Sequence, residues 1–272
     1  MAFTHDEAQL ISAGEDQTIR LWDLQVGEQQ RLTLPDNRVR SVIMAEGRVF
    51  AGLGEAPEAD IIVWDLQTNT LTNRLVGHTD TVADLDLNAD ETLLVSAGFD
   101  NTVRFWDAES GELVNTIETD TSVISVDFSD DGQFVAAGLA TRLGVGAVAI
   151  WDVMTFSEVQ RIPIEALASG VTFTADDTQV IAALNPLTGM SYLATFDVET
   201  GDELMQFVGG HTSLIIDADV SSDGRYLLSN GQNTIFYLWD MESGEIIQQF
   251  VGHNDEVREA RFTSDDQIIV SV

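Results

Sequence analysis

Short runs of residues that alternate between apolar and polar recur along the whole chain, and turns rich in Asp, Gly and Asn separate them. Alternation with a period of two is typical of β-strands that bury one face. In one stretch the runs cover residues 82–87, 93–97, 102–106 and 112–117. The pattern therefore predicts sets of four short strands, and it predicts no helix, linker or low-complexity segment between the sets.

These sets of strands repeat at a nearly constant interval. A Trp-Asp pair ends the third run of most sets, and the aromatic residues are separated by 42, 42, 45, 45 and 43 residues, at Trp22, Trp64, Trp106, Trp151, Phe196 and Trp239. A Gly-His pair precedes some of the sets, with its histidine at His78, His211 and His253. A period of about 40–45 residues indicates a repeat architecture in which neighbouring units bury a shared core.

Apolar residues occupy matching positions in the first strand of the better-aligned repeats. We expect these positions to form the core: Val82, Leu85 and Leu87, then Val123, Val126 and Phe128, then Ile215, Ala218 and Val220, then Val257, Ala260 and Phe262.

Four-stranded sets with Trp-Asp and Gly-His pairs at this spacing resemble the WD-repeat family of β-propellers, and the resemblance covers essentially the whole chain. The resemblance implies an all-β fold of four-stranded antiparallel blades, with six nearly complete blades and two strands of a seventh. It also implies a structural tetrad in a complete repeat. In this tetrad a histidine, a hydroxyl, a carboxylate and an indole N–H satisfy one another and join adjacent strands.

The repeats differ in how much of the tetrad they keep. The third repeat has all four members, at His78, Ser96, Asp100 and Trp106. The sixth keeps the spacing with an asparagine in place of the aspartate, at His211, Ser229, Asn233 and Trp239. The first lacks the histidine and keeps Ser12, Asp16 and Trp22. Repeats two, four and five have lost the set. The serine position falls on Phe50 or Ala51 in repeat two, on Ala136 in repeat four and on Ala182 in repeat five, so we expect apolar packing in these blades.

The ends of the repeat array leave two interpretations open. Residues 1–3 align with the end of a first strand, and Ser271 follows His253 at the 18-residue spacing of the tetrad. We expect residues 1–272 to be one WD-repeat domain that is truncated at both ends, a fragment of a seven-bladed or longer array. Alternatively, the first and sixth blades adjoin, and residues 256–272 lie outside the ring.

The charge of the chain narrows the classes of partner. Its 272 residues include 46 Asp and Glu and 12 Arg, with no Lys, for a net charge of −34. Such a chain lacks the basic surface that binding to nucleic acid or to an anionic membrane requires. No apolar run approaches the length of a membrane span, and residues 1–7 do not resemble a signal peptide. The compartment is left open, with the cytoplasm weakly preferred.

Candidate catalytic chemistry is sparse. There is no cysteine, three of the four histidines belong to Gly-His pairs, and no Gly-rich phosphate loop occurs. The acidic stretch 84–91 has alternating leucines and no glycine, which favours a strand and turn over a calcium loop. We expect no enzyme activity, metal or cofactor. The alternative is a propeller enzyme or metal-binding module that uses the central channel, through Asp84, Asp127, Asp217 or Asp219.

Longer loops occur between the second and third strands of three repeats, within residues 54–58, 140–146 and 185–190. By analogy with the family, these loops lie on the top face, where insertions usually mark a binding surface, although neutral drift of loop length would give the same pattern. The resemblance also implies binding positions near the Gly-His histidine and the turn aspartate. The candidate top-face residues are Phe99, Leu214, Ile216, Arg38, Arg40, Arg258, Glu15, Gln232, Arg142 and Leu187.

The function that the resemblance implies is a non-enzymatic scaffold that binds a protein or peptide on the top face. Exposed apolar residues would anchor such an interface. A group of Arg38, Arg40 and Arg258 would favour an acidic or amphipathic peptide, although these three arginines could equally be scattered. We expect the domain to be monomeric. A third hypothesis makes it the sensor or scaffold part of a larger signalling protein.

Overall fold

A computed structural model describes residues 1–3, 8–14, 16–23, 26–34, 38–54, 59–141 and 144–272. Every regular element in these ranges is a β-strand, so the described residues contain no helix that could cross a membrane. The chain divides into two compact units, Met1–Val123 and Ile124–Val272, which are described in turn.

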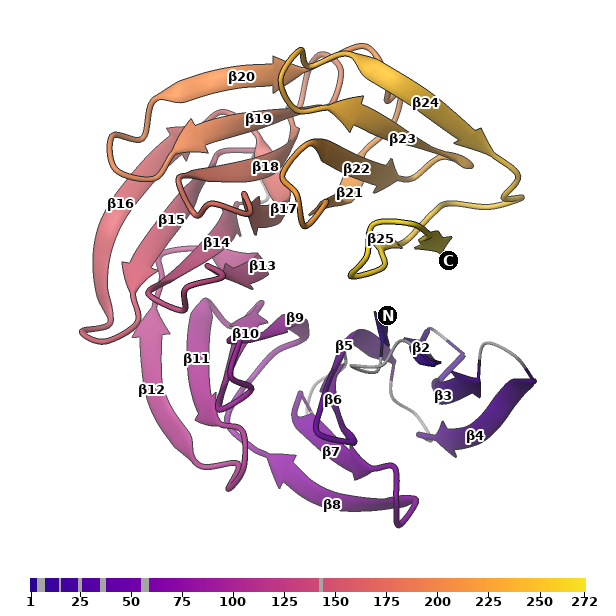
Figure 1. Cartoon of the computed structure of the whole chain (residues 1–272). Helices are drawn as coiled ribbons and strands as arrows, with labels where there is room; N and C mark the ends of the chain where they lie inside the picture. The colour runs from indigo at the N-terminus through magenta and orange to yellow at the C-terminus, as the bar shows by residue number, and fades with distance from the viewer. Residues whose placement is uncertain (4–7, 15, 24–25, 35–37, 55–58, 142–143) are drawn as a thin grey trace. The chain divides into compact units, whose positions relative to one another are not determined.

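Unit 1 contains three four-stranded antiparallel sheets, which are blades one to three (Figure 1). Blade one has β1 (Ala2–Phe3), β2 (Gln9–Ala13), β3 (Thr18–Asp23) and β4 (Gly27–Thr33). Blade two has β5 (Val39–Ala45), β6 (Arg48–Leu53), β7 (Ile61–Asp65) and β8 (Thr70–Leu75). Blade three has β9 (Val82–Leu87), β10 (Leu93–Gly98), β11 (Thr102–Asp107) and β12 (Leu113–Glu118). The first strands of successive blades contact one another, β1 with β5 and β5 with β9.

Unit 2 contains blades four to six and a two-stranded sheet, blade seven. Blade four has β13 (Ser122–Phe128, which begins at the end of unit 1), β14 (Phe134–Ala140), β15 (Gly146–Asp152) and β16 (Ser157–Ile164). Blade five has β17 (Leu167–Phe173), β18 (Gln179–Asn185), β19 (Tyr192–Asp197) and β20 (Glu203–Phe207). Blade six has β21 (Ile215–Val220), β22 (Tyr226–Gly231), β23 (Ile235–Asp240) and β24 (Ile246–Val251). Blade seven has β25 (Ala260–Phe262) and β26 (Ile269–Ser271).

This strand order confirms the predicted β-propeller fold, with six four-stranded antiparallel blades and two strands of a seventh. That residues 1–272 form one domain, truncated at both ends, stays a prediction.

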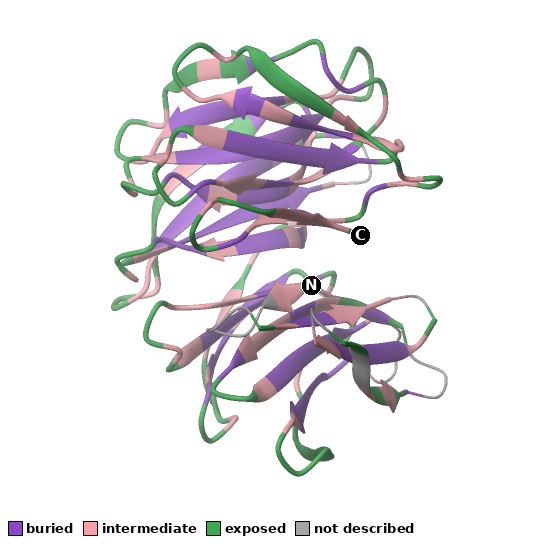
Figure 2. Cartoon of the chain, turned by 45° about the vertical axis from the view of Figure 1, so that its right-hand side comes forward, coloured by how far each residue is buried: buried purple, intermediate pink, exposed green. Residues whose placement is uncertain are grey.

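The core lies along the second and third strands of the blades, and the outermost strands are largely exposed, as Figure 2 shows by colour. The strand β10, for example, is buried from Leu94 to Gly98, whereas β8 is exposed except at Leu75. Of the predicted first-strand positions, the first two in each repeat are buried, and the third is half-buried except at Phe128. Blade-to-blade packing therefore buries the face that the alternation predicted.

The aspartate of each Trp-Asp pair has a local structural role. Asp107 accepts hydrogen bonds from the backbone N–H and the hydroxyl of Ser110, three residues on, at 2.7 Å each. The same bonds recur at Asp65, Asp152 and Asp240 with Thr68, Thr155 and Ser243. These donors lower the pKa of each of these carboxyl groups, because hydrogen bonds to the ionised form stabilise it. The pair thus fixes the turn into the outermost strand.

The predicted loop insertion of the fourth repeat is smaller in the structure than the sequence suggested. β14 and β15 pair without interruption to Ala140 and Gly146, and the backbone N–H and the hydroxyl of Thr141 both donate to the Val145 carbonyl. Most of the added length therefore extends the two strands. In the fifth repeat, by contrast, β18 ends at Asn185 and β19 begins at Tyr192, so residues 186–191 form a true loop.

Candidate functional site

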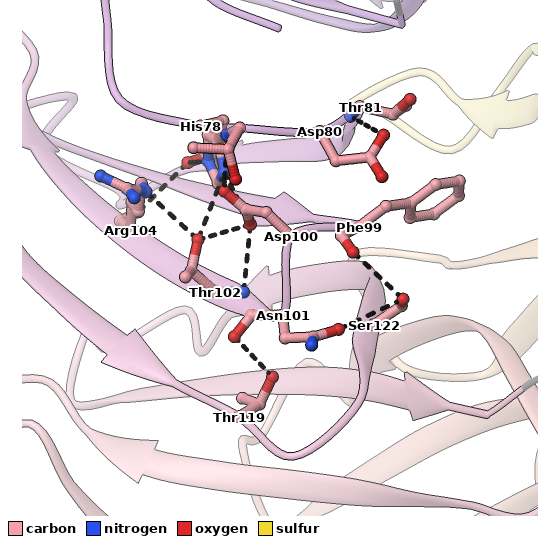
Figure 3. A network of polar contacts seen from close by, with 12 residues as sticks. His78, Asp80, Thr81, Phe99, Asp100, Asn101, Thr102, Arg104, Thr119 and Ser122 are labelled. Carbon is pink, nitrogen blue, oxygen red and sulfur yellow. Dashed lines mark hydrogen bonds and ion pairs between the residues drawn. The ribbon is translucent and has the colours of Figure 1, made fainter. Parts of the chain in front are cut away.

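The tetrad residues of blade three form one continuous chain of hydrogen bonds (Figure 3 shows the part around His78). The Trp106 indole N–H donates to Ser96 Oγ at 2.9 Å, and Ser96 Oγ lies 2.8 Å from His78 Nε2. His78 Nδ1 lies 3.0 Å from Asp100 Oδ2. Since Nδ1 faces a carboxylate, it carries the proton, and Nε2 accepts from the serine hydroxyl. One buried serine therefore links the strand β11 to the Gly-His segment.

Asp100 is the best-satisfied member of this set. Besides His78, it accepts from the backbone N–H of Thr79 at 2.9 Å and from the Thr102 hydroxyl at 2.7 Å. Burial acts to raise its pKa, but the His78 contact and the other donors outweigh burial and hold the pKa well below its usual range. The carboxylate thereby fixes the loop that carries Phe99.

In blade six the same chain is incomplete. Trp239 Nε1 and His211 Nε2 each lie 2.7 Å from Ser229 Oγ. His211 Nδ1 and Asn233 Oδ1, however, are buried without a hydrogen-bond partner. Burial lowers the pKa of His211 to about 4. The structure thus brings His211, Ser229 and Trp239 together and leaves Asn233 outside the chain of bonds.

Blade one keeps only the serine–indole bond, in which Trp22 Nε1 donates to Ser12 Oγ at 2.7 Å. In the same blade Asp16 pairs with Arg20 and accepts a hydrogen bond from the Thr18 hydroxyl. In blade two, Val49 pairs with Trp64, and Ala51 pairs with Ile62, two residues before the tryptophan. Ser96 pairs with the residue two before Trp106 in blade three, so Ala51 holds the serine position. The Trp64 indole N–H is accordingly buried without a partner.

We use "top edge" for the edge of a blade at which its first strand begins and its second strand ends. One backbone hydrogen bond recurs there in three blades. Phe99 N–H donates to the Thr81 carbonyl at 2.9 Å, and Gln232 N–H donates to the Leu214 carbonyl at 2.9 Å. Gly54 N–H donates to the Arg38 carbonyl at 2.7 Å. In each of these blades the chain just after the second strand therefore lies beside the start of the first strand.

In unit 1, the top edge of blade three presents Phe99. Its side chain is 38% exposed, and its carbonyl accepts from the Ser122 hydroxyl at 3.2 Å (Figure 3). The neighbouring Thr81 is buried and donates to the Gly54 carbonyl at 2.8 Å. Arg38 and Arg40, in blade two, are both exposed. Glu15 lies outside the described residues.

In unit 2, exposed apolar side chains gather on the top edges of three successive blades. Leu187 is 73% exposed in the blade-five loop, and Leu214 is 42% exposed where β21 begins. Val145 and Met190, which the sequence analysis did not select, are exposed as well. Gln232 is exposed, but Ile216 is half-buried because it lies within β21, which corrects its assignment to the exposed surface. Arg142 lies outside the described residues.

These loops contact one another from blade to blade. Gly144, in the blade-four turn, has a φ of +69°, and a Cβ added to it would lie 2.3 Å from Leu187 Cγ. Asn185, at the start of the blade-five loop, bonds both backbone groups of Ile215 in blade six: its Oδ1 accepts the N–H at 2.8 Å, and its Nδ2 donates to the carbonyl at 2.9 Å. Asn185 is buried and also donates to Ser169 Oγ at 2.8 Å.

The sequence analysis did not select Asn185, although its spacing from the serine position could have identified it. It lies three residues after Ala182, the spacing of Phe99 from Ser96 and of Gln232 from Ser229. The same position is thus exposed in blades three and six and joins two blades in blade five.

The predicted group of three arginines does not present three free charges. Arg258 in blade seven pairs with Glu256. Arg38 and Arg40 belong to unit 1, and their grouping with Arg258 stays a prediction.

The inner-strand aspartates that would serve a channel enzyme make contacts between blades. Asp127 Oδ2 accepts the Phe173 N–H, and Asp219 Oδ2 accepts the Phe262 N–H, at 2.7 Å each. Asp84 Oδ1 accepts from the Ser41 hydroxyl at 3.0 Å, and Asp217 pairs with Arg261 at 2.8 Å. Across the ranges given above, no group of three or more His, Asp or Glu side chains is arranged to hold a metal ion.

Comparison with known proteins agrees with this geometry. A family model described as "WD domain, G-beta repeat" matches residues 1–23, 69–107, 111–142 and 202–240. Transducin-like enhancer protein 2 of Mus musculus is 27% identical over 144 residues. That match spans 49% of this chain and only 18% of the relative's length. The four family matches fall on strands of four-stranded blades, and three of them end in the Trp-Asp pairs of blades one, three and six. The matched residues therefore carry WD repeats, and the structure places them in the four-stranded blades of a β-propeller.

Proposed function

We propose that this protein is a non-enzymatic scaffold that binds a partner protein or peptide through the top edges of its blades. The observation that carries the proposal is the set of exposed apolar side chains on adjacent loops of blades four, five and six, namely Val145, Leu187, Met190 and Leu214. Exposed apolar residues that gather on neighbouring loops commonly mark an interaction surface, because their burial drives association.

The loops that carry these side chains are held by buried polar contacts. Asn185 joins the blade-five loop to Ile215, the residue directly after Leu214. The Gln232 N–H bond to the Leu214 carbonyl joins the two loops of blade six. A surface that is ordered before binding loses little conformational entropy when a partner docks, which supports a role as a rigid platform.

The chemistry of the surface favours a partner with apolar anchor residues. The net charge of −34 also favours approach by a neutral or basic partner over an acidic one. Arg258, one of the three arginines expected to attract an acidic peptide, is neutralised by Glu256. Binding through exposed apolar anchors is therefore better supported than binding through a group of arginines.

The test uses a phage-displayed library of random peptides as the probe, because the partner is unidentified. Peptides selected on the wild-type protein are measured by calorimetry against a variant with Leu187→Asp and Leu214→Asp. The matched control carries Leu204→Asp and Ile247→Asp, at side chains of similar exposure on the outermost strands β20 and β24. Loss of apolar anchors commonly costs 1–3 kcal/mol, so we expect affinity to fall about tenfold or more for the top-edge variant.

The control variant should bind within about twofold of wild type, and circular dichroism should show both variants folded. Peptides that bind the top-edge variant as well as the wild type, or that lose affinity equally for both variants, would contradict the proposed surface.

A further inference from the structure

The sulfur atoms of this chain all belong to methionine, since its 272 residues include six methionines and no cysteine. Two of the six side chains are largely exposed, Met154 at 88% and Met190 at 57%. The other four are half-buried, namely Met1, Met44, Met205 and Met241. Because susceptibility to oxidants follows exposure, the thioethers of Met154 and Met190 are the first groups that an oxidant reaches.

Met190 lies on an ordered loop of the proposed binding surface. The loop of residues 186–191 joins β18 to β19 and also carries Leu187. Asn185, the residue before the loop, makes two buried hydrogen bonds to blade six. Gly189, directly before Met190, has a φ of +111°, which a residue with a side chain rarely adopts. Defined backbone contacts and a glycine turn thus present the thioether to solvent.

Met154 lies at the opposite edge of the neighbouring blade. β15 begins at Gly146, beside the top-edge turn, and runs away from that turn to Asp152. The turn that follows Asp152 carries Met154 and leads into β16. The more exposed methionine is therefore outside the proposed surface, and the less exposed one is within it. The two residues separate oxidation at the surface from oxidation elsewhere.

Oxidation by a peroxide changes the thioether from an apolar group to a polar one. The sulfur lone pair attacks a peroxide oxygen, an S–O bond forms as the O–O bond breaks, and hydrogen peroxide leaves as water. The sulfur loses two electrons, which the peroxide gains. Burial of a thioether against an apolar partner is favourable, whereas burial of the sulfoxide oxygen without a hydrogen-bond donor costs free energy.

We propose that Met190 is a site of reversible oxidation that controls partner binding at the top edges of blades four to six. This inference rests on the proposed function, in which Met190 is one of four exposed apolar side chains that a partner covers. The thioether form binds the partner, and the sulfoxide form binds it weakly. A methionine sulfoxide reductase restores the thioether, as a dithiol is oxidised to a disulfide and the oxygen leaves as water.

The proposal has a reciprocal consequence that locates the surface without a variant. A partner that covers Met190 keeps peroxide away from its sulfur, so the bound protein should oxidise more slowly there. Met154 lies at the opposite edge of blade four and should oxidise at the same rate in the bound and the free protein.

The probe is a peptide from the library described above. The chosen peptide contains neither methionine nor cysteine and loses affinity for the Leu187→Asp, Leu214→Asp variant. The full chain is treated with hydrogen peroxide, and catalase then destroys the excess. Mass spectrometry of proteolytic fragments measures the sulfoxide at each methionine, calorimetry measures the affinity for the peptide, and circular dichroism shows whether the oxidised protein is folded.

We expect sulfoxide at Met190 to weaken peptide binding about threefold to tenfold, part of the effect of losing a buried apolar side chain. The Met154→Leu protein should bind as the wild type does before treatment and lose affinity by the same factor after it. Met190→Leu keeps an apolar side chain of similar volume and has no sulfur, so peroxide should not change its affinity. The two sulfoxide reductases, one for each epimer, should restore binding to the oxidised wild type.

The proposal is overturned if protein oxidised at Met190 binds the peptide as untreated protein does. It is also overturned if peroxide weakens binding equally in Met190→Leu, or if the bound peptide does not slow oxidation of Met190. In these cases the peptide still depends on Leu187 and Leu214, so the proposed function stands and only the role of Met190 fails. If no library peptide loses affinity for the Leu187→Asp, Leu214→Asp variant, the proposed function fails, and this inference fails with it.

Discussion

His211 Nδ1 and Asn233 Oδ1 are both buried in blade six, and neither has a hydrogen-bond partner. In blade three the corresponding residues, His78 and Asp100, lie 3.0 Å apart and complete the polar chain. An asparagine amide can be oriented in two ways, but only a carboxylate presents acceptors in both. The single difference between Asp and Asn thus separates a fully satisfied buried network from a partly satisfied one.

Asn233→Asp should therefore stabilise the protein. We expect a gain of about 1 kcal/mol at pH 7, the net value of one hydrogen bond, measured by urea denaturation. The gain should grow as the pH falls from 7 to 5. In the wild type the unfolded His211 binds a proton near its ordinary pKa, about 6.5, whereas the folded residue does so only at a pKa of about 4. A carboxylate beside the ring raises the folded pKa and reduces this loss. Asn233→Ala, which supplies no acceptor, should give no gain.

Ser96→Ala should destabilise the protein more than a serine substitution at the surface does. The change leaves His78 Nε2 and Trp106 Nε1 buried without their shared partner. Two unsatisfied buried groups cost roughly 2–4 kcal/mol together. Ser110→Ala is the control, because the hydroxyl of that exposed serine bonds only within a turn, and the change should cost less than about 1 kcal/mol. Equal denaturation midpoints for the two variants would contradict a structural role for the tetrad.

Asn185→Ala should loosen the junction between blades five and six. It removes the acceptor for Ile215 N–H and a donor to the Ile215 carbonyl, both buried. We expect a loss of about 2–3 kcal/mol of stability and faster hydrogen exchange at the Ile215 amide. The control is Asn185→Asp, which keeps an acceptor for the N–H and loses the donor, so it should leave the Ile215 amide more protected than alanine does. Unchanged exchange in both variants would show that this residue does not order the loop.

Asp219→Asn should stabilise the protein at neutral pH and have little effect at pH 4. Burial raises the pKa of Asp219 to about 6, although Arg261 and the Phe262 N–H favour its ionised form. Between its unfolded pKa near 3.9 and a folded pKa of about 6, the folded state binds the extra proton, so the wild type loses stability as the pH rises. Asparagine keeps an acceptor for Phe262 and removes the half-buried charge.

We expect the stability of the Asp219→Asn variant relative to wild type to increase by about 1–2 kcal/mol between pH 4 and pH 7, because the partly exposed side chain is screened by solvent. Urea midpoints at the two pH values measure the difference. A difference that is constant with pH, or that falls, would show that the carboxylate is already stabilised as an anion.

Local pattern was enough to predict the strands and the sets of four that form the blades, and the resemblance to WD repeats supplied the tetrad positions. Trp22, Trp106 and Trp239 each donate to the serine ten residues before them, as the resemblance implied. These features depend on strand alternation and on short hairpins, so residues that meet in space are close in sequence.

The interactions between blades could not be predicted in this way. Asn185 bonds Ile215 across 30 residues, Asp127 bonds Phe173 across 46, and Leu187 lies on Gly144. Such contacts depend on how one sheet is placed against the next, which no local period encodes. The burial of Thr81 and Asn185, the partial burial of Ile216 and the pairing of Arg258 follow from that placement. The sequence by itself thus determined the repeat and its hydrogen-bonded strands, and only the tertiary structure decided which polar and apolar side chains remain available to a partner, because availability depends on neighbours that are distant along the chain.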